Sequence, residues 1–410
     1  METKNLFEML EKRGYIYQTT NQNKVKEMLE TPQTIYMGID PTANSLHIGH
    51  CFPMFVLRYL QEAGHKIVIL FGGATAMIGD PTGKKDMRQM VTQDFIAKNL
   101  DSLKAIVGKF LKLDGENPVQ FVNNYDWFKD MNYVSFMREI GVHFNVNKML
   151  ATDACKTRME EGGLTFFEMG YTLMQAYDFV YLNKTLGCTL QIGGSDQWAN
   201  IVAGTELARK LDLQNGTQTT MEALTVPLLT NSEGNKMGKT EKGALWVDKN
   251  KTSAYEFYQA FYNQPDASTE HFLKVLTTLP LDEIETIMQG DIIAAKHKMA
   301  FEVTKYVHGE EEAIKAQTTA KNLFSGENAG ENAPSITLSC FTEMPIIDFC
   351  TITKLCSSKS EARRLIEQNG IALNGEKVNL QTVVTGKDFE DGTTLLKKGK
   401  KTFLKVVLDK

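Results

Sequence analysis

Residues 34–50 read TIYMGIDPTANSLHIGH and decide the fold of the first half of this 410-residue chain. The apolar run at 34–39 predicts a buried strand, and the apolar spacing over 49–62 predicts a helix that ends before Gly64. The turn between them leaves the first N–H groups and the positive dipole end of the helix available, an arrangement that attracts phosphate. We therefore expect an α/β domain with a parallel sheet and a phosphate-binding turn.

The flanking sequence continues this alternation of strand and helix patterns. Further strands are predicted at 66–71, 119–122, 189–192 and 225–229, and a second amphipathic helix at 94–110. After about residue 250 the strand patterns fade, and helices are predicted at 253–261, 267–277, 281–289 and 291–308. A helical domain is therefore expected to follow the α/β domain.

The last part of the chain begins with a polar, glycine-rich stretch. Residues 326–334 read GENAGENAP, a composition typical of a linker. Behind it, a basic helix is predicted at 360–368 and a strand at 371–373, followed by an Asn374-Gly375 hairpin turn. Residues 344–410 carry 12 Lys and Arg against 8 Asp and Glu, a net of +4 in a chain of −5, which leaves −9 on the remainder. A basic tail is compatible with a phosphate-binding module, although many tails are basic for solubility alone.

The composition places the chain among ordinary globular proteins. It is 42% hydrophobic and 23% charged, and its length allows two or three domains. The most apolar stretch, 67–78, contains two glycines and is too short to span a bilayer, so we expect no membrane association. The six cysteines are scattered without a CxxC pair, which favours reduced thiols in a cytoplasmic protein over a disulfide framework or a zinc site.

His47 and His50 lie three residues apart in the first turn of the predicted helix and face the same side. On its own, an HxxH pair is more often a surface or capping pair, and a metal site would need further ligands that the neighbouring sequence does not supply. Gly49 has no Cβ and lets a flat nucleotide approach the backbone closely. Taken whole, residues 41–50 resemble the HIGH motif of class I aminoacyl-tRNA synthetases, with His-Ile-Gly-His intact.

A second motif, Lys236-Met237-Gly238-Lys239-Thr240, lies between Gly234 and Gly243. Two lysines and a hydroxyl on such a loop can neutralise charge that develops on a transferring phosphorus, although a solvated basic loop fits the loop alone equally well. The motif resembles the KMSKS loop of the same class, with Gly238 where the usual pattern has serine. The two motifs stand in the family's order, roughly 190 residues apart. Together they favour a synthetase.

A third set of residues suggests which amino acid is used. Tyr171, Gln175 and Asp178 lie at i, i+4 and i+7 of one predicted helix and share a face, although each alone is more often a core or surface residue. With Tyr36 on the strand 34–39, they resemble the tyrosine pocket of tyrosyl-tRNA synthetases. That resemblance implies that Tyr36 and Asp178 hydrogen-bond the phenol hydroxyl. It also implies that Tyr171, Gln175 and Asp80 hold the ammonium group.

Residues 191–198 read QIGGSDQW, which places two glycines and an acid at a strand end. The pattern suits ribose binding, although a structural turn also fits the glycines. It resembles the ribose-binding loop of the family, and residues 79–85 resemble its mobile loop, with Lys84 and Arg88 as contacts to pyrophosphate. The resemblance thus implies ATP-binding roles for Asp40, Gly49, Gly194, Asp196, Gln197 and Lys239. It implies catalytic roles in stabilising phosphate for Thr42, His47, His50, Lys236, Lys239 and Thr240.

Residues 346–378 resemble an S4-type RNA-binding module. Arg363 and Arg364 on its helix would contact phosphate, although adjacent arginines on an exposed helix are often only solubilising. The resemblance covers nearly the whole chain and implies four parts: a Rossmann-like catalytic domain with a connecting insertion, an α-helical anticodon-side domain, a linker and an S4-like module. We place these at residues 1–242, 243–325, 326–343 and 344–410.

The activity implied by the resemblance is that of a tyrosine–tRNA ligase. L-tyrosine is activated by ATP to tyrosyl-adenylate and transferred to the 3′ end of tRNA(Tyr), with Mg²⁺ delivered by ATP, no protein-bound metal, and a homodimer as the assembly. Three alternatives are a nucleotidyltransferase with a HIGH motif, a tryptophan enzyme and a non-catalytic RNA-binding protein. The S4-like tail disfavours the nucleotidyltransferase, and the Tyr36 and Asp178 pair disfavours the tryptophan enzyme. The intact histidines and lysines of the two motifs disfavour the non-catalytic protein.

Overall fold

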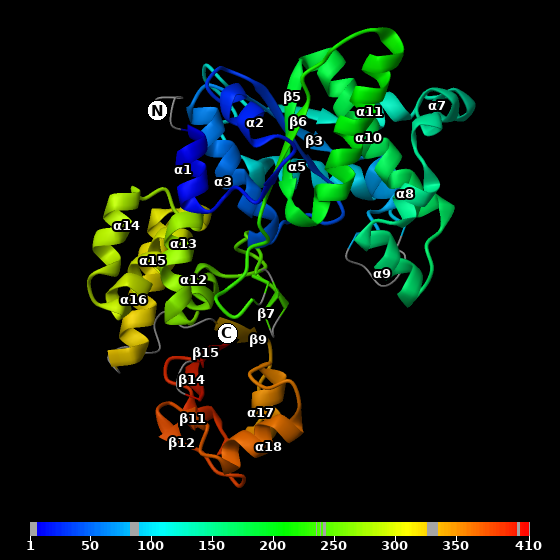
Figure 1. The fold of residues 1–410 in the computed structure, drawn as a ribbon. Coiled ribbons are helices and arrows are strands. Elements are labelled where there is room, and N and C mark those ends of the chain that lie inside the picture. Colours follow the sequence, from blue (N-terminus) through cyan, green and yellow to red (C-terminus); the bar gives the residue numbers. More distant parts are fainter. Residues whose placement is uncertain are drawn as a thin grey trace. The chain divides into compact units, whose positions relative to one another are not determined.

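The computed structural model describes residues 6–82, 90–234, 236–237, 239–240, 243–325, 335–399 and 402–409 (Figure 1). The chain forms two compact units, which are described separately below. The first comprises Met1–Thr252 and Asn263–Met299, and the second comprises Ser253–Tyr262 and Ala300–Lys410.

The first unit is built on a six-stranded sheet of order β1-β6-β5-β2-β3-β4. All neighbours are parallel except the edge pair β1 and β6, which is antiparallel. The central strands β2, β3 and β5 are buried along most of their length, and the apolar runs of β2 and β3 fit this position. The strands are β1 (Gln18–Thr19), β2 (Thr34–Ile39), β3 (Lys66–Phe71), β4 (Gln120–Asn123), β5 (Cys188–Gly194) and β6 (Glu222–Val226). The predicted parallel α/β fold is confirmed.

One predicted strand lies at a different place. The strand expected at 225–229 is found three residues earlier as β6, and it ends at Val226. Pro227 follows, and its nitrogen has no hydrogen to donate to a neighbouring strand.

Helices surround this sheet in the first unit. Two of them, α10 and α11, lie side by side against one face of the sheet, where Phe179 and Leu207 join a cluster with Val68 and Leu70 (Figure 1). α10 begins with a capping box at Thr165 and ends at left-handed Gly187. The helices are α1 (Leu6–Arg13), α2 (Gln22–Met28), α3 (Ile48–Glu62), α4 (Thr75–Ile78), α5 (Gln93–Val107), α6 (Tyr125–Phe128), α7 (Tyr133–Glu139), α8 (Val146–Leu150), α9 (Asp153–Glu161), α10 (Phe166–Leu186), α11 (Trp198–Asn215), α13 (Thr269–Leu276) and α14 (Leu281–Met288).

The helices expected between residues 243 and 325 are present and are shared by the two units. α12 (Ala254–Tyr262) packs on α16 (Glu310–Ser325) in the second unit, and α15 (Ile292–His308) contributes residues to both. The sequence did not predict α16. The division of the chain at residues 242, 325 and 343 stays a proposal, and the predicted linker at 326–334 lies outside the described residues.

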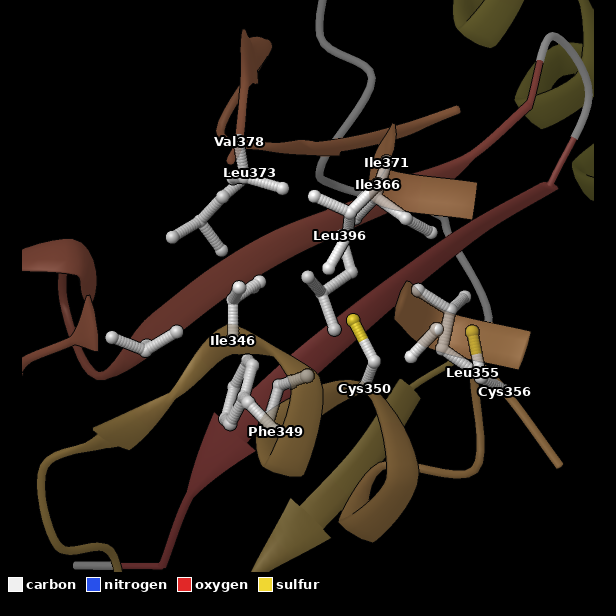
Figure 2. Close-up of a cluster of buried hydrophobic side chains, with 13 residues drawn as sticks. Ile346, Phe349, Cys350, Leu355, Cys356, Ile366, Ile371, Leu373, Val378 and Leu396 are labelled. Atoms are coloured by element: carbon white, nitrogen blue, oxygen red, sulfur yellow. The ribbon is translucent and has the colours of Figure 1, made fainter. Parts of the chain in front are cut away.

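The C-terminal module in the second unit is an α+β structure, as predicted. Its five-stranded sheet has the order β12-β11-β14-β15-β9, and α17 (Ile346–Ile352) and α18 (Lys359–Glu367) share a core with it. Figure 2 shows this core, in which Phe349 and Leu396 lie among buried aliphatic side chains and two thiols. The strands of the module are β9 (Ser335–Leu338), β10 (Met344–Pro345), β11 (Ile371–Leu373), β12 (Glu376–Lys377), β13 (Val383–Val384), β14 (Thr393–Lys398) and β15 (Thr402–Leu408).

The predicted hairpin turn of this module is confirmed. β11 and β12 pair antiparallel on either side of Asn374 and Gly375, whose φ angles are 49° and 89°. Both residue types adopt this left-handed region readily. Across the described part of the chain, every helix is too short or too polar to cross a bilayer.

Candidate active site

Predicted site residues follow the carboxyl ends of the parallel strands β2 and β5, and others lie on α10. The most deeply buried of them form one end of the site. Tyr36 on β2 is 1% exposed, and its hydroxyl has no hydrogen-bond partner among the described residues. Asp178 on α10 is 2% exposed and accepts hydrogen bonds from Nδ2 of Asn124 (3.0 Å) and Nε1 of Trp127 (2.9 Å). We call these four residues the buried end. A buried hydroxyl without a partner, beside a carboxylate, can accept and orient a polar group of a ligand.

Burial also sets the protonation of this end. It raises the pKa of Asp178 well above the usual range for a carboxyl group, while the hydrogen bonds from Asn124 and Trp127 oppose the rise. Burial likewise raises the pKa of Tyr36, and the nearby charge of Asp178 adds to the effect. Tyr36 is therefore neutral and keeps its proton.

Sequence reasoning did not assign Asn124 and Trp127. Asn124 follows β4, is fully buried, and also accepts from the backbone N–H of Ala74 (2.7 Å) and donates to Oγ1 of Thr75 (3.1 Å). These residues lie where a parallel strand ends, which is the one signal that could have pointed to them. Gln191 on β5 was also left unassigned. It pairs with Tyr36 in register, is buried, and has an Oε1 atom with no partner among the described residues.

Two carboxylates lie in the middle of the site, each held by its own partners. Oδ2 of Asp40 accepts from the hydroxyl of Tyr171 (3.0 Å), and Oδ1 of Asp40 accepts from the hydroxyl of Thr75 (2.9 Å). Oδ2 of Asp80 accepts from Nε2 of Gln197 (2.7 Å). The site therefore joins residues predicted for the amino acid to residues predicted for ATP.

Gln175 lies on α10, one turn after Tyr171. Its Oε1 atom is buried without a hydrogen-bond partner among the described residues. With the carboxylate of Asp80, which is 5% exposed, this amide oxygen offers acceptors suited to an ammonium group.

The loop after β5 contributes a further acid. A Cβ at Gly194 would lie 2.5 Å from Oδ1 of Asp196, so a larger residue there would displace this carboxylate. Burial raises the pKa of Asp196, the charge of Asp80 adds to the rise, and Lys236 opposes it. Lys236 of the second motif is therefore close enough to act on this carboxyl electrostatically.

The turn before α3 holds the two histidines. His47 is the N-cap of α3: its Nδ1 accepts from the backbone N–H of His50 over 3.2 Å, and the two imidazoles stack with centroids 3.6 Å apart. Thr42 precedes them in the same turn, and its N–H donates to the carbonyl of Asp40 (2.8 Å). His50 is exposed.

The second motif lies against this turn. A Cβ at Gly49 would lie 2.9 Å from the carbonyl oxygen of Met237, so the two segments are in close backbone contact. Lys236 is exposed and forms a β-bridge with Thr230. We call Thr42, His47, His50 and Lys236 the exposed end of the site.

Other predicted positions can be placed only in part. Lys239 and Thr240 form β7 (Lys239–Thr240), which pairs with β8 (Gly243–Ala244), but their side chains lie outside what the structure describes. Lys84 and Arg88 lie wholly outside the described residues. Within the described ranges, no cluster of three or more His, Cys, Asp or Glu side chains could hold a metal ion.

The predicted RNA-binding arginines lie on α18 in the second unit. Arg363 and Arg364 are both exposed, and they line a surface hollow of about 250 Å³ with Lys359, Ser360 and Glu367. The hollow is polar and carries three cationic side chains against one carboxylate.

Comparison with known proteins gives consistent matches along the chain. A family model described as class I tRNA synthetases (W and Y) matches residues 28–325, and one described as the C-terminal domain of SYY-like tyrosine–tRNA ligases matches residues 326–406. The tyrosine–tRNA ligase of Acetivibrio thermocellus is 48% identical over 412 residues, which cover 98% of this chain and 99% of that protein. The enzyme of that name from Clostridium kluyveri is 47% identical over 410 residues, with coverage of 98% and 99%.

Solved structures agree with this result. A C-terminally truncated mitochondrial tyrosyl-tRNA synthetase from Aspergillus nidulans superimposes with a TM-score of 0.68 at 32% identity, covering 78% of this chain and 94% of that one. A tyrosyl-tRNA synthetase from Archaeoglobus fulgidus, solved with L-tyrosine, has a TM-score of 0.56 at 20% identity, covers 76% and 99%, and supports the fold alone.

Proposed function

The chain belongs to the tyrosine–tRNA ligase family of class I synthetases, and on that premise we propose how its residues divide the reaction. The family activates L-tyrosine with ATP to tyrosyl-adenylate and transfers the tyrosyl group to tRNA(Tyr). In the first step, an oxygen of the tyrosine carboxylate attacks the α-phosphorus and pyrophosphate leaves. In the second, a terminal ribose hydroxyl of the tRNA attacks the acyl carbon and AMP leaves. Neither step requires a nucleophile from the protein.

The buried end selects tyrosine. The observation that carries this proposal is the buried hydroxyl of Tyr36, which lacks a partner among the described residues and lies near Asp178. The phenol hydroxyl donates to Asp178, which also accepts from Asn124 and Trp127, and it accepts from Tyr36. The buried hydroxyl of Tyr36 therefore gains a partner when tyrosine is bound. Phenylalanine would leave the Tyr36 hydroxyl without a partner and give Asp178 no donor from the substrate. Tyrosyl-tRNA synthetases are the standard example of this kind of rejection.

ATP–pyrophosphate exchange tests this proposal directly. The purified protein is assayed with tyrosine, phenylalanine and tryptophan at matched concentrations. Exchange with tyrosine and almost none with the other two is expected. Equal rates with tyrosine and phenylalanine would contradict the assignment of Tyr36 and Asp178.

The ammonium group of tyrosine is held by Tyr171, Gln175 and Asp80. The buried Oε1 of Gln175 and the carboxylate of Asp80 are acceptors, and both are largely withdrawn from water. Asp40 fixes the hydroxyl of Tyr171 at 3.0 Å and so orients the ring at this position. An ammonium group can donate three hydrogen bonds, which matches the number of side chains proposed.

The exposed end stabilises the phosphates. His47 and His50 lie at the start of α3, Thr42 precedes them in the turn, and Lys236 adjoins Met237, whose carbonyl lies against Gly49. We assign Lys239 and Thr240 to the same task from the motif alone. Catalysis then comes from binding the phosphates more tightly as charge develops on them. Mg²⁺ arrives with ATP, whose oxygens are its usual ligands.

The ATP ribose and base lie along Asp40, Gly49, Gly194, Asp196 and Gln197. Gly49 and Gly194 carry no Cβ, which lets a flat ligand approach the backbone closely. The carboxylate of Asp196 can accept from a ribose hydroxyl.

The C-terminal module binds tRNA. Support comes from the exposed Arg363 and Arg364 on α18 and from the cationic hollow that they line. Charge reversal of both arginines should weaken tRNA binding and reduce its salt dependence, while pyrophosphate exchange stays unchanged. Filter binding at several salt concentrations measures this, and an unchanged affinity would remove the assignment.

We also propose that the enzyme is a cytoplasmic homodimer. Large apolar side chains are exposed along residues 133–167 of the first unit, which is unfavourable in water unless a second copy covers them. They include Tyr133, Val134, Val142, Val146 and Phe166. Sedimentation velocity should show a dimer that Val142→Asp weakens, and a monomeric wild type would contradict the proposal. The six free cysteines are compatible with a reducing compartment.

A further inference from the structure

The segment just after β8 is joined to the turn before α3 by its backbone. His47 and Trp246 face each other in a short antiparallel bridge. Two hydrogen bonds of 3.0 Å flank the bridge, one from the N–H of Ile48 to the carbonyl of Leu245 and one from the N–H of Val247 to the carbonyl of Leu46. The segment that follows the lysine motif is thereby anchored on the segment that carries the histidines.

The side chain of Trp246 extends this contact to the imidazole itself. Its ring centroid lies 6.5 Å from that of His47, with the planes inclined by 59°. His50 stacks on the same imidazole at 3.6 Å. The ring of His47 therefore has an aromatic neighbour on both the helix segment and the segment after β8.

Lys251 holds Trp246 in place. Its ammonium nitrogen lies 4.6 Å from the centroid of the indole ring, within the range of a cation–π interaction, and it donates to Oδ1 of Asn44. A turn that begins at Asp248 brings Lys251 back toward Trp246. In this turn the carbonyl of Asp248 accepts from the N–H of Lys251 at 3.0 Å. The Asp248 carboxylate also accepts from the N–H of Asn250 at 2.9 Å. The result is a chain of contacts from Asn44 through Lys251 and Trp246 to His47.

We propose that Trp246 and Lys251 are positioning residues for the reaction, acting through His47. Trp246 limits the rotation of the imidazole, and Lys251 fixes the indole against Asn44 in the same turn. This inference deepens the proposed phosphate-binding role of His47 and rests on it.

The chemistry of His47 explains why orientation matters. Its Nδ1 accepts from the N–H of His50, so the neutral ring carries its proton on Nε2. That Nε2–H can donate to a phosphate oxygen only if the ring plane is held toward the nucleotide. A ring that rotates about its side-chain bonds would lose this alignment, and small misplacements of a reacting group are costly.

The experiment uses the full-length enzyme and four single variants: Trp246→Ala, Trp246→Phe, Lys251→Ala and, as a matched control in the same exposed loop, Lys249→Ala. Single-turnover adenylate formation should fall about 10-fold in Trp246→Ala and less in Lys251→Ala. Trp246→Phe should retain most of the wild-type rate because it keeps an aromatic ring beside His47. KM for tyrosine should stay within about twofold throughout, and Lys249→Ala should match the wild type.

A spectroscopic readout separates positioning from a general loss of structure. Imidazole ¹⁵N spectra of the labelled protein should show His47 protonated at Nε2 in the wild type and a mixture of tautomers in Trp246→Ala. A wild-type rate together with a wild-type spectrum in Trp246→Ala would overturn the proposal. If Trp246→Ala does not fold, the single-turnover rate and the His47 spectrum are measured on Lys251→Ala and Trp246→Phe instead. A wild-type rate and spectrum in Lys251→Ala would then overturn the proposal.

A double-mutant cycle distinguishes failure of this inference from failure of the proposed role of His47. If Trp246 acts through His47, adding Trp246→Ala to His47→Ala should cause little further loss of rate. Additive losses would overturn the positioning role and leave the role of His47 standing. If His47→Ala alone keeps the full rate while Trp246→Ala still alters the His47 spectrum, the phosphate role of His47 is the part that fails.

Discussion

The buried end and the exposed end of the site differ in nearly every physical respect. At the buried end, Tyr36 and Asp178 are 1% and 2% exposed, and hydrogen bonds from Asn124 and Trp127 hold the carboxylate. At the exposed end, His50 and Lys236 face solvent, and the backbone start of α3 supplies much of the geometry. The difference shows how such an enzyme separates the recognition of its amino acid from the stabilisation of phosphate charge. Choosing between similar side chains needs dry, prearranged polar groups, whereas assisting phosphoryl chemistry needs charge near an entering nucleotide.

The strongest way to break this comparison is to remove the carboxylate of the buried end. Asp178→Ala should lower tyrosine-dependent pyrophosphate exchange about 1,000-fold, because the phenol hydroxyl of tyrosine would lose its acceptor and the donors of Asn124 and Trp127 would lose their buried partner. Asp178→Asn is the control that keeps the shape of the side chain. Circular dichroism confirms folding, and a folded Asp178→Ala that keeps its exchange rate would show that this end does not select the substrate.

The exposed end should respond in a different kinetic parameter. His50→Ala should slow adenylate formation about 100-fold while the Kd for tyrosine stays unchanged, since its proposed partner is a phosphate that gains charge in the transition state. Lys236→Ala should behave similarly. Single-turnover kinetics and equilibrium dialysis measure the two quantities. A weaker tyrosine Kd with an unchanged rate would reverse the roles given to the two ends.

A milder change tests the hydroxyl of Tyr36. Tyr36→Phe should lower the preference for tyrosine over phenylalanine about 10-fold, because it removes one neutral hydrogen bond without opening a large cavity. The ratio of kcat/KM values for the two amino acids gives the answer. Unchanged selectivity would mean that Asp178 alone recognises the hydroxyl.

The smallest effect concerns pH and stability. Burial raises the pKa of Asp178 in the folded protein, so the folded state binds this proton more tightly than the unfolded state does. The contribution of Asp178 to stability is therefore present at low pH and is lost as pH rises from its ordinary value of about 4 through the raised pKa. Asp178→Asn, which has no proton to lose, should therefore become more stable relative to the wild type as the pH rises above that ordinary value, measured by urea unfolding at a series of pH values. A pH-independent difference would mean that the carboxylate is not destabilised by burial.

The sequence predicted the sheet well because its central strands are continuous apolar runs. β2 and β3 lie where they were expected. The prediction for β6 was three residues too late, because the apolar run at 225–229 includes Pro227, which the strand excludes. Most C-terminal strands were missed, since several are only two to four residues long and carry no clear period. β9, β10 and β13 place apolar side chains on the core shared with α17 and α18, a long-range contact that a local pattern does not reveal. β12 is exposed and is held by its hairpin pairing with β11.

The site could be predicted only through resemblance. Tyr36 and Asp178 lie on a strand and a helix far apart in the sequence, and no spacing rule brings them together. Asn124 and Trp127 follow β4 in a segment without periodicity, so their hydrogen bonds to Asp178 appear only in three dimensions. The pairing of Trp246 with His47 is non-local in the same way.

The contact between Gly49 and Met237 has a consequence for redesigning this enzyme to accept other amino acids. A β-carbon at residue 49 would lie 2.9 Å from a backbone carbonyl oxygen, and no change of rotamer can move that atom away. Gly38 is different, because a β-carbon there would lie 3.9 Å from the side chain of Leu70, an ordinary contact. A variant library should therefore leave residue 49 as glycine and draw its diversity from residues 36 and 178. The chosen substrate can then change while the two nucleotide-facing segments keep their spacing.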